Sequence, residues 1–139
     1  MIEIKPMQPE DLQAVLNNPI EGDIRFFTVL PDQPAVSAWY KGKVIGVGGI
    51  NLFWEGVGEA WVLLSKDIES CRFGTYRMIR RMFKSLTKEY GLQRLQATVR
   101  SGWWDAIKMV EKLGFQREGL MKHYCPNGDD VIMYSITKD

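Results

Sequence analysis

The chain has 139 residues, the length of one domain, and 45% of them are hydrophobic, which is enough for a buried core. Its 18 basic and 17 acidic residues nearly cancel, and a pI of about 7.7 argues against a dedicated nucleic-acid-binding protein. No apolar run has the length of a membrane span, the first residues lack the pattern of a signal peptide, and two cysteines with one histidine suffice for neither a disulfide framework nor a zinc site. We therefore expect one cytoplasmic domain over residues 1–139, without membrane or nucleic-acid partners.

The first third of the chain predicts a strand, a helix and an irregular segment. The sequence IEIKPM alternates apolar and polar residues, as a half-buried strand does. Gln8-Pro9-Glu10-Asp11 suits a first helical turn, and apolar residues then recur at positions 12, 15 and 16. Residues 17–34 contain three prolines and no regular period, so we expect a loop there, with room for one short helix.

The middle of the chain predicts three consecutive antiparallel strands. AVSAWY and VIGVGGINLFW flank Lys41-Gly42-Lys43, which is typical of a hairpin turn. A second turn, EGVG at residues 55–58, leads into EAWVLL.

The remainder predicts helix, strand, helix and two strands. A helix runs to Tyr90, with its apolar stripe at Ile79, Met82, Phe83, Leu86 and Tyr90 and a stop at Gly91. LQATVR alternates as a strand, WWDAIKMVEKLG is a helix ending at Gly114, and FQREGLMKHY and DVIMYSIT are strands joined by a turn at residues 125–129. The whole order predicts an α/β (α+β) protein with a single mixed, mostly antiparallel twisted sheet of about seven strands flanked by helices.

The segment AIKMVEKLGFQREG, from Ala106 to Gly119, resembles the fourth-helix signature of the GNAT superfamily of acyl-CoA-dependent N-acyltransferases. The ending HYCPNGDDVIMYSITK resembles the closing hairpin of that family, and the order of elements matches over nearly the whole length, with residues 17–34 shortened. The chain is similar, more narrowly, to short GNAT-like proteins encoded by tailed phages and prophages. Some of those proteins are thought to be virion components. If the chain is phage-encoded, we therefore expect it in the virion or the host cytoplasm.

The resemblance implies a cleft for acyl-CoA where EAWVLL and LQATVR splay apart. The backbone of Trp61, Val62, Leu63 and Leu64 would then hold the pantetheine arm, and a backbone N–H there would stabilise the oxyanion. AWVLL also suits an ordinary core strand, and the two interpretations are compatible.

The resemblance also implies a pyrophosphate site at the start of the next helix, where the family motif is Q/R-x-x-G-x-G/A. The nearest match is CRFGTY, residues 71–76, in which Gly74 fits, while Cys71 and Tyr76 depart from the motif. Arg72, Thr75 and Arg77 could compensate with side-chain donors, so the implied contacts are Arg72, Gly74, Thr75, Tyr76 and Arg77. The alternative is a solvated basic helix face.

Catalysis in this family needs a base and an acid. Glu59, at the start of its strand, has the position of the base, although a polar residue after a glycine turn is an equally good interpretation. The family's acid is a tyrosine in the fourth-helix signature, and that position is Val110 here, which cannot donate a proton. Tyr124 is the remaining candidate acid, with a structural role as its alternative.

The departures from the family fall on the functional positions, while the residues that specify the fold remain. The leading hypothesis is an acetyl-CoA-dependent N-acetyltransferase, with acetyl-CoA as co-substrate and a small molecule or protein as the amine acceptor. The alternatives are a catalytically silent GNAT fold with a virion or host-protein partner, and an acyl-CoA binder without turnover. Exposed tryptophans at positions 54, 103 and 104 leave a homodimer open.

Overall fold

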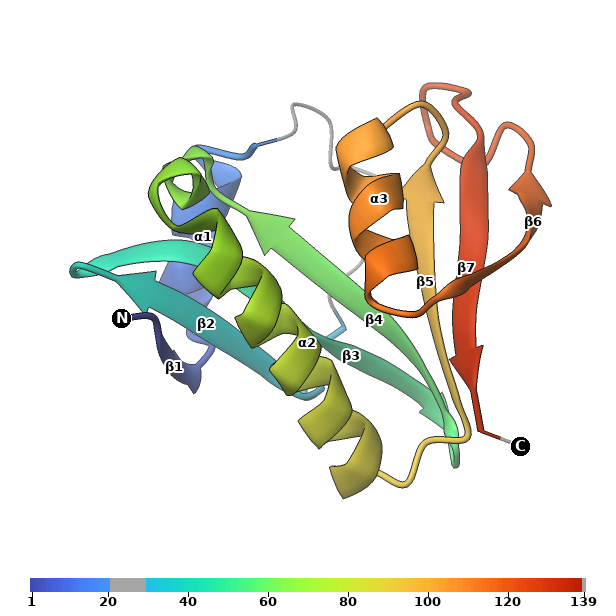
Figure 1. The fold of residues 1–139 in the computed structure, drawn as a ribbon, viewed down its shortest axis with the longest axis horizontal. Helices are drawn as coiled ribbons and strands as arrows, with labels where there is room; N and C mark the ends of the chain where they lie inside the picture. The colour runs from blue at the N-terminus through green and yellow to red at the C-terminus, as the bar shows by residue number, and fades with distance from the viewer. Residues whose placement is uncertain (21–29, 139) are drawn as a thin grey trace.

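The computed structural model describes residues 1–20 and 30–138, apart from the side chains of residues 69, 70 and 72, and its elements follow the predicted order (Figure 1). The strands are β1 Glu3–Pro6, β2 Ala35–Tyr40, β3 Lys43–Trp54, β4 Val57–Leu64, β5 Arg94–Arg100, β6 Gln116–Met121 and β7 Val131–Thr137. The helices are α1 Pro9–Leu16, the 3₁₀ helix η1 Lys66–Cys71, α2 Arg72–Glu89 and α3 Trp104–Lys112. The sequence left room for one short helix within residues 17–34. Residues 21–29 of that segment lie outside the described part of the structure.

The seven strands form one sheet in the order β1-β2-β3-β4-β5-β7-β6. Every neighbouring pair is antiparallel except β4 and β5, which are parallel. The predicted mixed, mostly antiparallel sheet is therefore confirmed. The parallel pair arises because α2 carries the chain from the end of β4 back to the start of β5, whereas the other neighbours in β1–β4 are joined by turns or by α1 and the segment after it.

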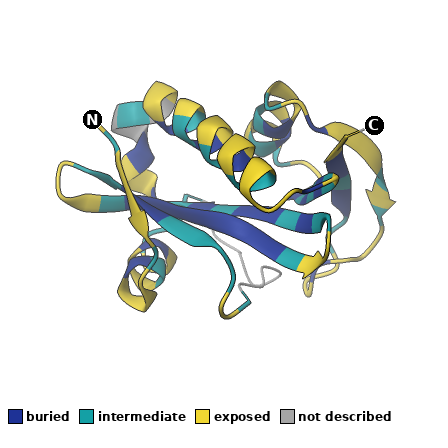
Figure 2. Ribbon diagram, turned by 90° about the horizontal axis from the view of Figure 1, so that it is seen from below, coloured by how far each residue is buried: buried dark blue, intermediate teal, exposed yellow. Residues whose placement is uncertain are grey.

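Helices cover both faces of the sheet (Figures 1 and 2). The main core lies between the sheet and α2 and α3, and Leu95, Ala97 and Val99 all point into it, as their alternation predicts. A second apolar cluster lies under α1 and contains Val15, Val47, Trp61 and Leu63. The side chains of β4 therefore divide between two cores. No helix in the described part of the chain is long and apolar enough to cross a membrane.

Glycine ends α2 as predicted. Gly91 has a positive φ of 59°, its N–H donates to the Lys88 carbonyl, and the Leu92 N–H donates to the Thr87 carbonyl, which is the Schellman arrangement. The prediction for the apolar stripe was wrong at its last position, because Tyr90 lies at the helix cap and is exposed. The second hairpin turn is also tighter than predicted, since β4 already begins at Val57.

Candidate functional site

The parallel strands β4 and β5 pair over a short length and then separate. Their register contains three rungs, Val57 with Arg94, Gly58 with Leu95, and Glu59 with Gln96. Beyond the third rung β4 stays paired with β3 and β5 stays paired with β7. Figure 1 shows the resulting V, which is closed at the bottom and open at the top. The vertex of this V is the Glu59–Gln96 rung.

The backbone of β4 alternates between β3 and the open side of the V. The Ser65 N–H donates to the Ile45 carbonyl of β3 at 2.9 Å, so in an antiparallel pair every second residue before Ser65, including Leu63 and Trp61, also bonds to β3. The residues between them must turn their backbone groups away from β3. Val62 and Leu64 therefore direct N–H and C=O groups into the V.

One of these groups has a partner at the mouth of the V. The Ile20 N–H donates to the Leu64 carbonyl at 2.9 Å, and the Lys66 N–H donates to the Asn18 carbonyl at 3.0 Å. The segment before Ile20 thus covers the last part of the β4 edge. The edge that faces the V between this cover and the vertex is centred on Val62, whose N–H and C=O have the arrangement that an amide-containing arm could pair with.

The carboxylate of Glu59 lies on the α1 face of the sheet at the vertex. Glu59 points to the same face of β4 as Trp61 and Leu63, which pack in the cluster under α1. The Gln96 Nε2 donates to Glu59 Oε1 at 3.1 Å, and the Arg94 Nε donates to Gln96 Oε1 at 2.9 Å. The predicted base is therefore held by a neighbour from β5.

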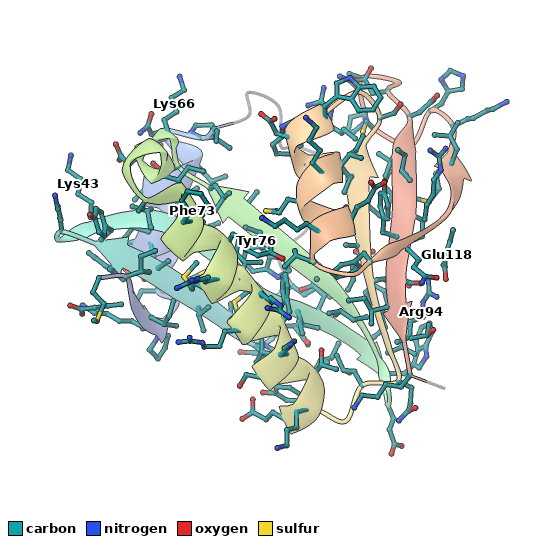
Figure 3. The ribbon with its side chains drawn as sticks, viewed as in Figure 1. Lys43, Lys66, Phe73, Tyr76, Arg94 and Glu118 are labelled. Atoms are coloured by element: carbon teal, nitrogen blue, oxygen red, sulfur yellow. The ribbon has the colours of Figure 1, made fainter. Side chains whose placement is uncertain are left out.

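Arg94 continues this chain of hydrogen bonds to the next strands (Figure 3). Its two terminal nitrogens donate to the two carboxylate oxygens of Glu118 on β6 at 2.8 and 2.6 Å, and the Ser135 hydroxyl of β7 donates to the same carboxylate at 2.6 Å. The Arg94 and Ser135 hydrogen bonds lower the pKa of Glu118 to about 2. The bond with Glu118 also raises the pKa of Arg94. A polar network thus crosses the β4, β5, β7 and β6 half of the sheet.

The turn between β4 and α2 is a 3₁₀ helix rather than an open loop. The Lys66 N–H is bonded to Asn18, the Asp67 N–H donates to the Ser65 hydroxyl at 3.1 Å, and the Ile68 N–H donates to the Ser65 carbonyl at 3.2 Å. A loop that cradles phosphate presents its N–H groups to the anion. Here the first three amides after Ser65 are already satisfied within the protein.

The predicted phosphate contacts on α2 differ in accessibility. Gly74 and Arg77 are exposed, whereas Thr75 is buried and its hydroxyl donates to the Cys71 carbonyl at 2.9 Å. Thr75 therefore has no free side-chain donor for an anion, contrary to the expectation of compensation, and can reach one through its backbone. The side chain of Arg72 lies outside the described part.

Tyr76 links α2 to α3 (Figure 3). Its hydroxyl donates to the backbone carbonyl of Lys112, the last residue of α3, at 3.1 Å. The Lys112 Nζ in turn lies 4.5 Å from the centroid of the Tyr76 ring, a cation–π contact. These two contacts join the helices that flank the V.

No family model matches the sequence, and no curated protein matches it either. Solved structures match nearly the whole chain. Ard1 from Thermoplasma volcanium has 16% identity and a TM-score of 0.82, covering 98% of this chain and 97% of its own. The ribosomal-protein-S18-alanine N-acetyltransferase from Escherichia coli has 18% identity and a TM-score of 0.72, covering 99% and 94%. A variant of the spermidine N-acetyltransferase SpeG from Vibrio cholerae has 12% identity and a TM-score of 0.78, covering 98% and 93%.

This is the GNAT acetyltransferase fold. The predicted resemblance is confirmed at the level of the fold, and identities this low extend no further. Two of these neighbours have an acceptor in their names, the alanine of ribosomal protein S18 and spermidine, and the two acceptors differ, so the fold by itself does not identify an acceptor. The narrower resemblance to phage-encoded proteins stays a prediction.

The position of the family's acid holds Val110, and the candidate acid Tyr124 is not brought to Glu59. Val110 is buried in the core under α3. Tyr124 is 52% exposed and follows β6, at the end of the sheet where β5 stops. The vertex rung at Gln96 is four residues before the end of β5, which corresponds to ~13 Å of strand. The structure therefore separates Tyr124 from the vertex.

Sequence reasoning missed three polar residues of this region. Gln96 lies on the polar side of LQATVR and Arg94 directly precedes that segment, but their reach to Glu59 depends on which strands pair. Tyr134 is buried beneath α3, and its hydroxyl donates to the Glu111 carboxylate at 3.0 Å. Burial raises the pKa of Tyr134, and the bond to Glu111 raises it further. No local sequence signal distinguishes Tyr134 from other aromatic residues in strands.

A small apolar cavity lies beneath α2, apart from the vertex of the V. Its volume is about 10 Å³, and Gly48, Val62, Met78 and Met82 are among its lining residues. A space of this size holds about one water molecule.

Proposed function

We propose that this protein is an acetyl-CoA-dependent N-acetyltransferase that transfers an acetyl group to an amine. The observation that carries the proposal is the V between β4 and β5, with a carboxylate at its vertex and backbone groups of β4 turned into it. The strand edge would hold the donor, and the carboxylate would serve the acceptor. An ordinary sheet would continue the β4–β5 pairing and close this space.

The residues of the chain have distinct roles in the proposed reaction. Val62, with the N–H of Leu64, would pair with the amides of the pantetheine arm, and a β4 N–H would stabilise the oxyanion. Glu59 would take a proton from the acceptor ammonium, directly or through water. The amine nitrogen then forms a bond to the acetyl carbon and gives up its second proton to solvent, the carbon–sulfur bond breaks, and the thiolate of CoA takes a proton from solvent.

Solvent is the better proton source because of the placement of the candidate acids. Tyr124 is remote from the vertex, and Val110 has no proton to give. A thiolate is a tolerable leaving group, and holding the thioester and amine together supplies much of the rate acceleration in such reactions. Loss of the family's tyrosine is therefore compatible with turnover.

The nucleotide of the donor would lie at the start of α2. The backbone of Arg72, Gly74, Thr75 and Tyr76 and the side chain of Arg77 would face its pyrophosphate, where the helix dipole also favours an anion. The Thr75 hydroxyl and the amides of residues 66–68 are already bonded within the protein, so these groups would not contribute to that contact.

A second candidate function follows from those satisfied amides. The amides of Lys66, Asp67 and Ile68, just before the phosphate motif, are bonded within the protein, and Val110 stands at the position of the family's acid. Both features favour a catalytically silent GNAT fold that serves as a structural or host-interaction protein, in a virion if the chain is phage-encoded. An acyl-CoA binder without turnover is the intermediate case.

Two measurements test these alternatives. Calorimetric titration with acetyl-CoA measures donor binding, and thiol release measures turnover with spermidine and with a peptide that begins with alanine as acceptors. Micromolar binding with release of CoA that depends on an added amine supports the enzyme. Binding without release with either amine favours the binder, and no binding at millimolar acetyl-CoA removes the proposed function and leaves the silent fold.

A further inference from the structure

Tyr76 lies on the flank of α2 that faces α3. The side chains of Ile79 and Phe83 anchor the buried face of α2 in the main core. Tyr76 precedes Ile79 by three residues, so its side chain leaves the helix beside that face rather than opposite it. The ring is half-buried and points toward α3 (Figure 3).

The hydroxyl of Tyr76 satisfies a carbonyl that α3 cannot satisfy itself. The last four carbonyls of a helix have no partner within it. At the end of α3 the Met109, Val110 and Glu111 carbonyls accept from N–H groups of the following turn, and the Lys112 carbonyl accepts from the Tyr76 hydroxyl. The contact is therefore part of the α3 C-terminal cap, and the Lys112 ammonium adds a cation–π contact with the same ring.

These contacts place a side chain across the gap that a donor would use. The edge of β4 that faces the V is centred on Val62, and the pyrophosphate of the donor would lie at the start of α2. A molecule that runs between these two points passes along the α3 side of the first turns of α2, where Tyr76 crosses. The family motif has glycine or alanine at this position, which would leave that path open.

We propose that Tyr76 is a gate that limits access of the thioester donor to the V. In the closed state its ring is tied to Lys112, and the donor binds after this tie breaks. Tyr76 would therefore lower donor affinity, whereas a tyrosine that contacts the donor would raise it. The inference rests on the proposed function, since it names the same donor and the same cleft.

The size of the effect follows from the two contacts that must be broken. One neutral hydrogen bond and one exposed cation–π contact together reduce the population of the open state, and the apparent affinity, by about tenfold. Tyr76→Phe removes the hydrogen bond and keeps the ring. Tyr76→Ala removes both contacts and the obstruction. The expected order of donor affinity is thus alanine above phenylalanine above wild type.

Calorimetric titration of CoA into the wild type, Tyr76→Phe, Tyr76→Ala and Tyr90→Ala tests the gate. Tyr90 is the matched control, an exposed tyrosine at the other end of the same helix. We expect Tyr76→Ala to bind CoA about tenfold more tightly than wild type, Tyr76→Phe to bind about threefold more tightly, and Tyr90→Ala to be unchanged. Tyr76→Phe keeps the packing of the ring and carries the test if the alanine variant does not fold.

The outcomes separate the gate from the proposed function. Equal or weaker CoA binding by both Tyr76 variants, with measurable binding by wild type, overturns the gate and leaves the enzyme proposal standing. No CoA binding by any of the four proteins overturns the enzyme proposal and the gate with it. Tighter binding by Tyr90→Ala as well would assign the effect to loosening of α2 and also overturn the gate.

Discussion

The side-chain amide of Gln96 donates to Glu59 because Arg94 fixes the orientation of that amide. An arginine side chain has donors and no acceptor, so the Arg94 Nε at 2.9 Å must face the oxygen of Gln96. The amide nitrogen of Gln96 is then turned toward Glu59, at 3.1 Å. An N–H donor needs an acceptor, and a carboxylate provides one. Arg94 therefore orients the proposed base Glu59 through Gln96, which lies two residues further along β5.

Replacement of Glu59 by glutamine should lower turnover by roughly 10²–10⁴-fold while leaving acetyl-CoA affinity within about twofold of wild type. Glutamine keeps the shape and the hydrogen-bonding capacity of the side chain but cannot take a proton, and removal of a general base costs typically 10²–10⁴-fold. Steady-state kinetics and donor titration measure the two quantities. Turnover at the wild-type rate would exclude Glu59 as the base.

Loss of the amide of Gln96 should lower kcat about tenfold and leave the KM for acetyl-CoA unchanged, because the base loses its orientation while the donor edge stays intact. Gln96→Leu removes the amide. Arg94→Lys should have a similar effect, since one ammonium cannot hold Glu118 through two bonds and also orient Gln96. Glu118→Gln, which keeps the Arg94–Gln96 bond, is the control. A change in KM without a change in kcat would contradict a positioning role.

Replacement of Arg77 by alanine should weaken CoA binding about threefold to tenfold, because an exposed guanidinium at the start of α2 can pair with phosphate. Lys88→Ala, at the far end of α2, removes an equal charge and serves as the control. The effect of Arg77→Ala should shrink as salt increases. Equal losses of CoA affinity in both variants would show that the total positive charge of α2 matters, and not a contact between Arg77 and a phosphate.

The Glu118 carboxylate should stabilise the fold above about pH 4.5 and lose this contribution as the pH falls. Its pKa is about 2 in the folded chain, against an ordinary value of 4.5, so protonation costs the folded state more than the unfolded state. The difference in Tm between wild type and Glu118→Gln should be constant from neutral pH to about 4.5 and vanish near pH 2. A difference that persists at pH 2 would count against this assignment. Because Glu118 is solvent-exposed, the whole effect should be small.

Replacement of Gly49 by alanine should destabilise the fold by about 1–3 kcal/mol. A methyl group there would overlap the Pro34 carbonyl and lie 2.9 Å from the Cα of Ala35, both of which are backbone atoms that cannot move aside without disturbing β2. Gly119→Ala is the matched control, since a methyl group at that strand position meets nothing within 4 Å. Chemical denaturation of the two variants measures the difference. Equal stabilities would show that β2 can shift at this point.

The sequence was sufficient for the order of elements and the class of the sheet. Alternation in LQATVR, the glycine stop at Gly91 and the apolar stripe of α2 up to Leu86 are local signals, and each has the predicted structure. The error at Tyr90 has a local reason, because the helix ends one residue earlier and its cap turns the ring to solvent. Residues 17–34 had no periodic signal to predict from.

The candidate site was predictable in part. The position of Glu59 followed from the resemblance, but its bond to Gln96 depends on a register between strands that are 37 residues apart. The satisfied amides of Lys66, Asp67 and Ile68 depend on Ser65 and on a segment near Asn18, which no local pattern connects. Tyr76 was recognised as a departure from the motif. Its tie to Lys112 required the packing of α2 beside α3.

The three rungs between β4 and β5 join two smaller sheets, one of four strands and one of three. Long ladders hold the strands within each of these sheets, so the line between them is the place where the fewest backbone bonds must break for the molecule to open. Among the amides that are hydrogen-bonded between neighbouring strands, those along that line should exchange fastest in the free protein. A ligand bound in the V would contact both of the smaller sheets. The more tightly it bound, the more cooperatively these two sheets would unfold.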